Sequence, residues 1–391
     1  MLSFAQMLAR VAGALCVGVL ARAGEAPASL PDPFRFRDGS RVTSRADWER
    51  RRTELRADLL DFEYGHAPPL PVVGVRDEQR EELRLEPDGL HATRVTVTLT
   101  FGNTTARAGY WFPSEAAGPR PTILADEPVW WPNPFLTNHV VNRVLARGYV
   151  LAGFWNDDFA SFEKPEHHPA QTAFPGYDWG VTAVAAWAYG VTMNWLETLP
   201  VVDARKVAIW GHSRRGKACL LAGALDDRFA AVLPHMSGMG GAAAYRVRGR
   251  GAQELEQLLE RFWLRPRMFA FIDQEESLPF DQHWLHALVA PRALCSHVGI
   301  ADAWGDPAGE QASWRAAREV YAWLDASEQL GIHFADYGHH DPNGPEGGDS
   351  WETALEFLAW RFEGKPPRKA FARPLFPDAP GPFTWRAPAT R

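Results

Sequence analysis

The stretch that decides the fold is Lys206–Leu225, which reads KVAIWGHSRRGKACLLAGAL. Residues 206–210 form a short, nearly continuous apolar run, as in a strand covered on both faces, and residues 214–225 have helical spacing. Ser213 lies in the tight turn between them. Such a turn pushes the serine Oγ out above the sheet, beside backbone N–H groups that can stabilise an oxyanion. We therefore expect Ser213 to be a nucleophile, with the alternative that it only caps the helix.

Two glycines flank this serine and permit the close approach that the turn demands. They are Gly211 and Gly216. The second comes one residue later than in the pattern G-x-S-x-G, so the generic motif is only nearly met. The turn by itself thus indicates a hydrolase with a slightly irregular elbow.

Short apolar runs and helical patterns alternate on both sides of this turn. The runs are at 122–125, 149–154, 229–233 and 292–298, and the helical patterns at 45–62, 138–146, 181–196, 311–324 and 351–362. Such alternation predicts an α/β protein, and we expect an α/β-hydrolase fold, a three-layer αβα sandwich with a mostly parallel central sheet. The period-two run at 94–101 and the segment at 109–112 predict an antiparallel N-terminal edge.

We predict a signal peptide at 1–23 and a single catalytic domain at 24–391. The apolar run Val11–Leu20 is preceded by Arg10 and followed by Ala-Arg-Ala, which is typical of a secretory signal, although an anchored N-terminal helix is the alternative. The protein is then secreted or periplasmic, with no membrane contact after the signal is removed. The long, charged segment at about 245–277 is expected to be a helical insertion over the active-site face.

Composition narrows the class of partner. A formal net charge of −7 over 391 residues argues against nucleic acid, which requires a basic face. The 17 tryptophans suit either a large core or platforms for sugar rings. Outside the signal only Cys219 and Cys295 remain, so we expect small core residues and no disulfide framework.

A base and an acid must follow Ser213, because the chain order for this fold is serine, acid, histidine. The loop Gly338-His-His-Asp341 follows a strand-like segment at 331–336, and spacing alone does not choose between its two histidines. A metal site is the alternative for this loop, but a closed site needs three or four ligands. For the acid we choose Asp302, since Asp306 precedes Pro307 and is expected to cap the next helix.

Several motifs occur together in the chain: GHSRRGK at 211–217, MSGMGGA at 236–242, LPFDQH at 278–283, APR at 290–292, DAWGDPAGE at 302–310 and GHHD at 338–341. This set resembles the glucuronoyl esterases, carbohydrate esterase family 15, and its last two members resemble the bacterial branch. The likeness spans roughly residues 30–362. It implies a serine esterase, with no metal or organic cofactor, that acts on plant cell-wall polysaccharide. We expect a monomer, although the sequence does not exclude a dimer. The bond cleaved would be the ester joining 4-O-methyl-glucuronate groups of xylan to lignin alcohols.

The resemblance also implies roles for individual residues. Ser213 matches the nucleophile, Arg214 an arginine that helps hold the oxyanion, and Lys217 and Trp304 residues that contact the sugar. The family pattern Gly-x-His-Asp gives the role of base to His340 in preference to His339. Without the family, Lys217 would be read as a solvated surface charge.

Two departures from the family pattern leave alternatives open. Met236 occupies the position at which one branch of the family has the acid of its catalytic triad. Methionine has no carboxylate, so we expect Asp302 to be the acid. A further pair of sugar-contacting polar residues is matched only weakly, by Gln253 and Glu260. An esterase acting on acetylated xylan or pectin, or a carbohydrate-binding relative without activity, therefore remains an alternative.

Overall fold

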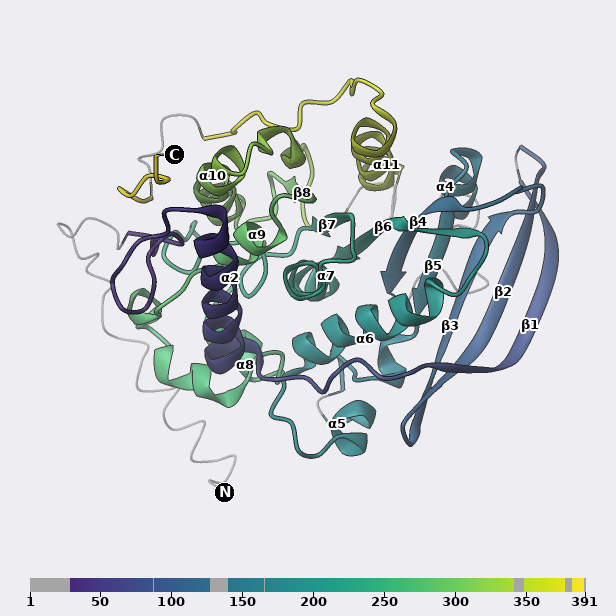
Figure 1. Cartoon of the computed structure of the whole chain (residues 1–391), viewed down its shortest axis with the longest axis horizontal. Helices are drawn as coiled ribbons and strands as arrows, with labels where there is room; N and C mark the ends of the chain where they lie inside the picture. Colours follow the sequence, from purple (N-terminus) through teal and green to yellow (C-terminus); the bar gives the residue numbers. More distant parts are fainter. Residues whose placement is uncertain are drawn as a thin grey trace.

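A single mixed sheet organises the chain. The computed structural model describes residues 29–86, 88–126, 140–164, 166–340, 348–376 and 382–389, so the segment predicted as a signal peptide lies outside the described residues. These residues form a nine-stranded sheet in the order β1-β2-β3-β5-β4-β6-β7-β8-β9 (Figure 1). The strands are β1 (Gly74–Leu85), β2 (Leu90–Phe101), β3 (Thr104–Pro113), β4 (Arg120–Asp126), β5 (Val150–Phe154), β6 (Val202–His212), β7 (Ala231–His235), β8 (Ala293–Gly299) and β9 (Leu330–Ala335).

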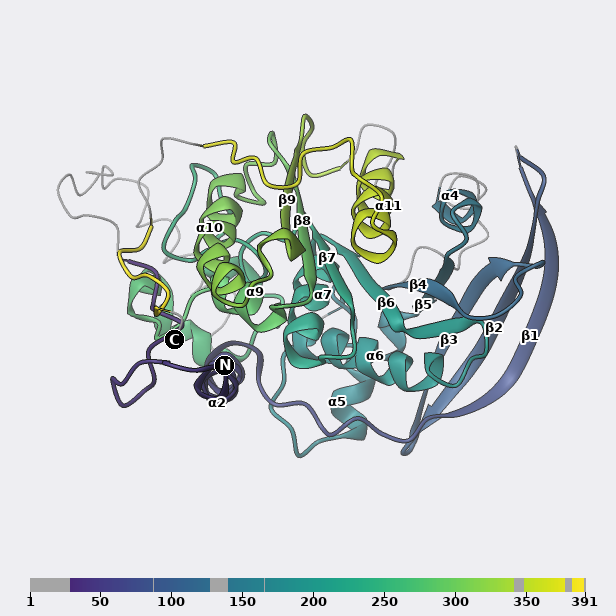
Figure 2. The same ribbon diagram turned by 45° about the horizontal axis from the view of Figure 1, so that its top comes forward.

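Helices cover both faces of this sheet. They are α2 (Arg45–Leu59), α4 (Asn142–Ala146), α5 (Pro169–Ala173), α6 (Val181–Leu196), α7 (Arg214–Leu225), α8 (Leu255–Leu259), α9 (His283–Val289), α10 (Pro307–Trp323) and α11 (Gly348–Glu363). On one face α6, α7, α9 and α10 pack in that order, each against the next, while α4 and α11 lie on the other (Figure 2). The predicted α/β-hydrolase architecture of three layers is confirmed.

The parallel half of the sheet comes from the apolar runs. β5, β4, β6, β7, β8 and β9 pair in parallel, and β4, β5, β7 and β8 are buried or nearly so along their length. Parallel strands with helices on both faces have no solvent side, so alternation disappears from their sequences. The helices predicted at 181–196 and 214–225 end where α6 and α7 do.

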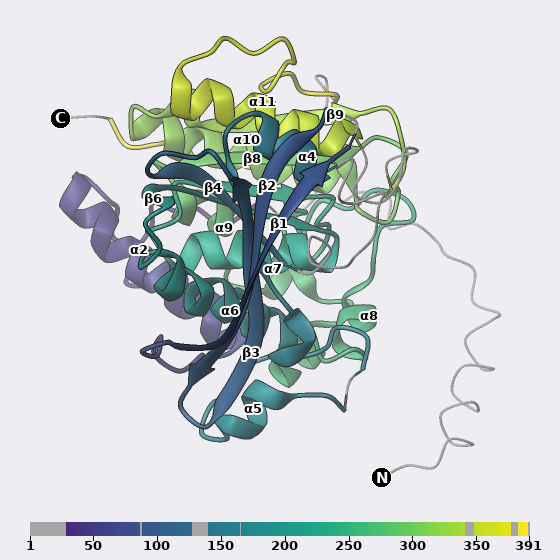
Figure 3. The same ribbon diagram turned by 90° about the vertical axis from the view of Figure 1, so that its right-hand side faces the viewer.

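The N-terminal edge is antiparallel, as predicted, and is one strand wider. β2 pairs with β3 with Arg94 opposite Trp111, and β3 pairs antiparallel with β5. The unpredicted strand is β1, which forms the edge that faces the viewer in Figure 3. Its residues GVRDEQREELRL are mostly charged and exposed, so no apolar pattern marks the strand. Charged side chains on an edge strand discourage pairing with another chain.

The segment 245–277 contains only short helical pieces. These are α8 and two 3₁₀ turns at Pro266–Phe271 and Glu275–Ser277, so the expected helical character is limited to single turns. Helix α9 was not predicted. Cys219 and Cys295 are buried free thiols, in agreement with their expected place in the core. In the part of the chain described, no helix is long and apolar enough to cross a bilayer.

Candidate active site

The turn at Ser213 has the strained geometry of an exposed nucleophile. β6 ends at His212 and α7 begins at Arg214, so one residue makes the whole connection. Ser213 has φ 57° and ψ −126°, a region that residues other than glycine rarely adopt. Its backbone N–H donates to the carbonyl of His235 at 2.8 Å, which fixes the turn against β7. Strain of this kind persists only where neighbouring structure imposes it, and it is concentrated at functional sites.

The two glycines are required by packing around this turn. A Cβ at Gly211 would lie 2.3 Å from the carbonyl oxygen of Arg215. A Cβ at Gly216 would lie 2.9 Å from Cβ of Ser237 and 3.0 Å from the carbonyl oxygen of His235. Residue 216 is therefore glycine because α7 approaches the end of β7 at that position.

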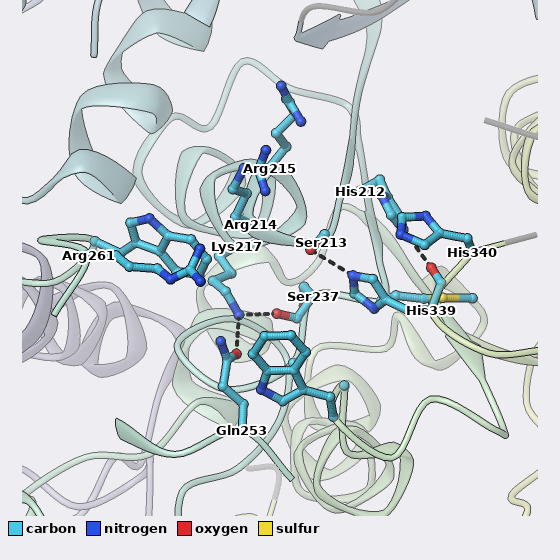
Figure 4. A pocket seen from close by; sticks show the side chains of 15 residues that line it. His212, Ser213, Arg214, Arg215, Lys217, Ser237, Gln253, Arg261, His339 and His340 are labelled. Atoms are coloured by element: carbon cyan, nitrogen blue, oxygen red, sulfur yellow. Dashed lines mark hydrogen bonds between the residues drawn. The ribbon is translucent and has the colours of Figure 1, made fainter. Parts of the chain in front are cut away.

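His339 connects the serine to a buried carboxylate. Its Nε2 lies 2.8 Å from Oγ of Ser213 (Figure 4), and its Nδ1 lies 2.6 Å from Oδ2 of Asp302. Asp302 is 4% exposed, and its other oxygen accepts the backbone N–H of Gly305 at 2.9 Å. Because a carboxylate accepts, Nδ1 of His339 carries the proton, which leaves Nε2 free to accept one from the serine.

The expectation that His340 is the base is wrong in this geometry. Its ring lies 5.0 Å from the ring of His339 and 5.1 Å from that of His212, centroid to centroid. Within the described residues, the ring of His340 has no hydrogen bond to Ser213 or Asp302. The two histidines are adjacent in the chain, so their side chains diverge, and in Figure 4 only the ring of His339 is directed at Ser213. The other nitrogen of that ring contacts Asp302. The family pattern Gly-x-His-Asp selected His340, whereas the histidine that contacts Ser213 is the preceding residue, His339.

Asp306 has the capping role expected of it. Its side chain accepts the N–H of Gly309 at 3.0 Å, at the start of α10, and that of Gly249 at 3.0 Å. The side chain at the alternative acid position, Met236, lines the site but provides no carboxylate. Of the candidates weighed from sequence, Asp302 alone reaches the base.

Lys217 is buried, which rules out the reading of a solvated charge. Its side chain extends from α7 into the site, and the residue is 3% exposed. Nζ donates to the carbonyls of Ser237 at 2.5 Å and Met239 at 2.6 Å, and to Oε1 of Gln253 at 3.1 Å (Figure 4). Burial lowers the pKa of Lys217 to about 7. Three oxygens thus hold the ammonium at a fixed point in the wall of the site.

Arg214 and Arg215 begin α7 and each meet an acid. The guanidinium of Arg214 is paired with the carboxylate of Glu163 and lies 5.9 Å from the ring centroid of Phe162. Arg215 lies 3.0 Å from Asp126, which is fully buried. Burial raises the pKa of Asp126 to about 6, against the opposing effect of the two arginines.

These groups surround a pocket of about 360 Å³. Trp304, 48% exposed, offers an accessible indole face in its lining. Gln253, Arg261 and Trp263, all from the segment 245–277, also line the pocket. Glu260, from the same segment, is not part of the lining. The full lining is His212, Ser213, Arg214, Arg215, Lys217, Met236, Ser237, Gly238, Gln253, Arg261, Trp263, Trp304, Gly305, His339 and His340. Among these described residues four are Arg or Lys and none is acidic.

The site contains no group suited to hold a metal among the residues that the structure describes, since nowhere do three His, Cys, Asp or Glu side chains converge in a metal-binding arrangement. Both ring nitrogens of His339 are already engaged by Ser213 and Asp302. Asp341, the third residue considered for a metal site, lies outside the described residues.

Comparison with known proteins places this geometry in a family. The family model described as "Glucuronyl esterase, fungi" matches residues 95–325. The 4-O-methyl-glucuronoyl methylesterase 1 of Wolfiporia cocos is 30% identical over 324 residues, which cover 80% of this chain and 75% of that protein. The chain belongs to the glucuronoyl esterase family.

Solved structures of glucuronoyl esterases agree with this assignment. A carbohydrate esterase family 15 glucuronoyl esterase from Caldicellulosiruptor kristjansonii superposes with a TM-score of 0.78 at 28% identity, over 93% of this chain and 98% of that one. The glucuronoyl esterase from Solibacter usitatus gives a TM-score of 0.73 at 27% identity, over 88% of this chain and 100% of that one. The similarity therefore extends over nearly the whole fold of this glucuronoyl esterase family member.

Sequence reasoning missed several pocket residues, among them His212, Arg261 and Trp263. His212 was read only as part of the elbow, and Arg261 only as part of a charged segment. A single charge in a loop far along the chain gives no periodic signal, and only folding brings Arg261 next to α7. Gln253, a weak candidate from sequence, is directly bonded to Lys217.

Proposed function

We propose that the protein is a serine esterase that hydrolyses esters of glucuronic acid or its 4-O-methyl ether, as found in lignin–carbohydrate linkages of glucuronoxylan. The observation that carries the proposal is the continuous series from Ser213 through His339 to Asp302, at 2.8 and 2.6 Å, in a chain of the glucuronoyl esterase family. Membership of a family does not by itself establish an activity, so the activity has to follow from the geometry of the site.

The reaction has two steps. Oγ of Ser213 attacks the ester carbonyl while Nε2 of His339 takes its proton, and Asp302 orients and stabilises the resulting imidazolium. His339 then passes this proton to the leaving alcohol as the C–O bond breaks, which leaves the uronoyl group on the serine. A water molecule, deprotonated by His339, attacks the acyl-enzyme and releases the uronate, and Ser213 recovers its proton.

The start of α7 stabilises the charge that develops on the carbonyl oxygen. The first N–H groups of a helix have no acceptor within it, and that of the residue after the nucleophile is directed at the oxyanion in this fold. Here that residue is Arg214, whose guanidinium is held by Glu163 beside the pocket. A cation that is already oriented pays no reorganisation cost when the negative charge forms.

The remaining polar groups of the pocket suit a sugar. Gln253 and Arg261 can donate hydrogen bonds to hydroxyl oxygens, and the exposed face of Trp304 can stack on a pyranose ring. Lys217, whose three donors are engaged, holds the side-chain amide of Gln253 in place for such a contact. The described lining holds four Arg or Lys residues and no carboxylate, which suits the release of a carboxylate product. We expect no metal or organic cofactor to be required.

Export of the enzyme and its oligomeric state belong to the same proposal. The apolar run at residues 11–20 supports secretion to the periplasm or the medium after cleavage near residue 23, and we expect the mature enzyme to act as a monomer on plant cell-wall polysaccharide. Amino-terminal sequencing of the exported protein tests the cleavage site, and sedimentation tests the oligomeric state.

Release of benzyl alcohol from benzyl glucuronate tests the activity. We expect turnover by the wild type, loss of at least a thousandfold in Ser213→Ala, and no loss in the surface variant Ser327→Ala. Acetylated xylan and methyl-esterified pectin are assayed alongside. Faster turnover of either would transfer the substrate assignment to that class, and binding of glucuronoxylan without turnover of any ester would contradict the esterase proposal.

A further inference from the structure

Four histidines occupy equivalent positions on four neighbouring strands. His212 on β6 is in register with His235 on β7, His235 with His297 on β8, and His297 with His333 on β9. Residues in register on adjacent strands direct their side chains to the same face of a sheet. The ring centroids are accordingly 4.9, 4.5 and 5.3 Å apart along the row. We call these four residues the histidine ladder.

Two members of the ladder contact the loop that carries His339. Nε2 of His212 lies 2.8 Å from the backbone carbonyl oxygen of His339 (Figure 4). Because a carbonyl only accepts, this nitrogen of His212 carries the hydrogen. Nε2 of His297 lies 2.7 Å from the hydroxyl of Tyr337, two residues earlier in the same loop. The loop is thus held at two points by side chains that are fixed in the sheet.

Burial of three members of the ladder favours their neutral form. His212, His235 and His297 are between 1% and 8% exposed, and burial lowers the pKa of all three, that of His212 to about 3. A neutral imidazole has a single N–H, and in His212 that N–H is committed to His339. The middle member, His235, has no hydrogen-bond partner on either ring nitrogen among the described residues, so it contributes by packing.

We propose that His212 is a positioning residue for the general base, which holds the backbone of His339 so that its ring reaches both Ser213 and Asp302. This inference rests on the proposed esterase function. The ring of His339 is attached to a loop rather than to a helix or strand, so its position depends on what holds that loop. Displacing a catalytic group by about 1 Å can cost on the order of a hundredfold in rate.

Substitutions of His212 test the proposal on benzyl glucuronate. His212→Leu removes the donor, and we expect kcat to fall on the order of ten- to a hundredfold with KM nearly unchanged. His212→Gln places an amide N–H at about the same reach, and we expect it to recover most of that loss. His235→Leu is the matched control in the same ladder, and we expect it to lower thermal stability more than kcat.

A spectroscopic signature separates positioning from general destabilisation. The proton shared by His339 and Asp302 gives a far-downfield ¹H NMR resonance in a folded enzyme. We expect this resonance to be lost or exchange-broadened in His212→Leu and retained in His212→Gln and His235→Leu. If His212→Leu does not fold, Tyr337→Phe, which deletes one hydroxyl from the other attachment, is expected to lower kcat in the same direction by a smaller factor.

The failures of the two proposals are distinguishable. If the wild type hydrolyses no uronate ester, the proposed function fails before this experiment begins. If the wild type is active, and a folded His212→Leu keeps wild-type kcat and the downfield resonance, the positioning role is overturned. Equal losses of kcat in His212→Leu and His235→Leu would also overturn it, because packing alone would then account for both.

Discussion

The carboxylate of Asp302 lies 2.6 Å from Nδ1 of His339, and this contact distinguishes two adjacent histidines that the sequence left equivalent. A general base needs one nitrogen held by an acceptor so that the other is free to take a proton. His339 meets that condition, with Ser213 at its second nitrogen. His340 lies beside it without such a partner among the residues described.

His339→Ala is expected to abolish hydrolysis of benzyl glucuronate, with a loss in kcat of about a thousandfold or more, because no other group can take the proton of Ser213. His340→Ala is expected to retain kcat within about tenfold, since its ring only lines the pocket. Initial rates at saturating substrate measure both. Equal losses of kcat in the two variants would leave the choice of general base between His339 and His340 undecided.

Asp302→Asn is expected to keep the fold and to lower kcat by about a thousand- to ten-thousandfold, because an amide can hold His339 in the wrong tautomer. Asp306→Ala removes the cap of α10 instead and should cost about 1 kcal/mol of stability while kcat stays within tenfold. Thermal melts and initial rates of the two variants together distinguish the residue that acts as the triad acid from the residue that caps α10. A larger loss of kcat in Asp306→Ala would reverse the two roles.

Arg261→Gln is expected to raise KM for glucuronate esters on the order of fivefold, about 1 kcal/mol, with kcat nearly unchanged, as for a contact made equally to substrate and transition state. In Figure 4 Arg261 lies on the opposite side of Lys217 from Ser213, so we expect it to contact the sugar rather than the reacting carbonyl. The control is Arg267→Gln in the same segment, whose guanidinium carbon lies 3.8 Å from the ring centroid of Phe62. A fall in kcat with unchanged KM would contradict this role of Arg261.

Glu310→Gln is expected to stabilise the protein progressively, relative to the wild type, as the pH rises from 5 to 8. Glu310 is 1% exposed, and burial raises its pKa to about 8 from an ordinary 4.5, although its Oε1 accepts the N–H of Gly238 at 2.9 Å. Between those values the folded chain binds more protons than the unfolded chain. The stability that Glu310 contributes is therefore present below about pH 4.5 and lost as the pH rises toward 8.

The measurement is the melting temperature of the variant minus that of the wild type across this pH range. Glutamine keeps the acceptor for Gly238 but cannot ionise, so the difference isolates the carboxyl group. Glu256→Gln, on the exposed side of α8, is the control and is expected to give a constant difference. A constant difference for Glu310→Gln as well would show that its ionisation is not linked to folding.

The sequence by itself determined the architecture and the position of the nucleophile. Continuous apolar runs bounded by turn signals predict strands buried on both faces, and the change from the run at 206–210 to the helical spacing at 214–225 leaves residues 211–213 for the turn, with Ser213 directly before the helix. These signals are local, since periodicity is a property of neighbouring residues. The edge strand β1 was missed for the same reason, because its residues are held by pairing to β2 and carry no apolar pattern of their own.

Only the tertiary structure decided which side chains complete the site. His339 and His340 are neighbours in the chain with the same chemistry, and the choice between them depends on the direction in which a loop presents each ring to Ser213 and Asp302. The same holds for Lys217, which becomes a buried donor only because the carbonyls of Ser237 and Met239 converge on it. Packing sets the directions and distances between segments that are far apart in the sequence. The local sequence of one such segment therefore does not reveal how its side chains meet those of another.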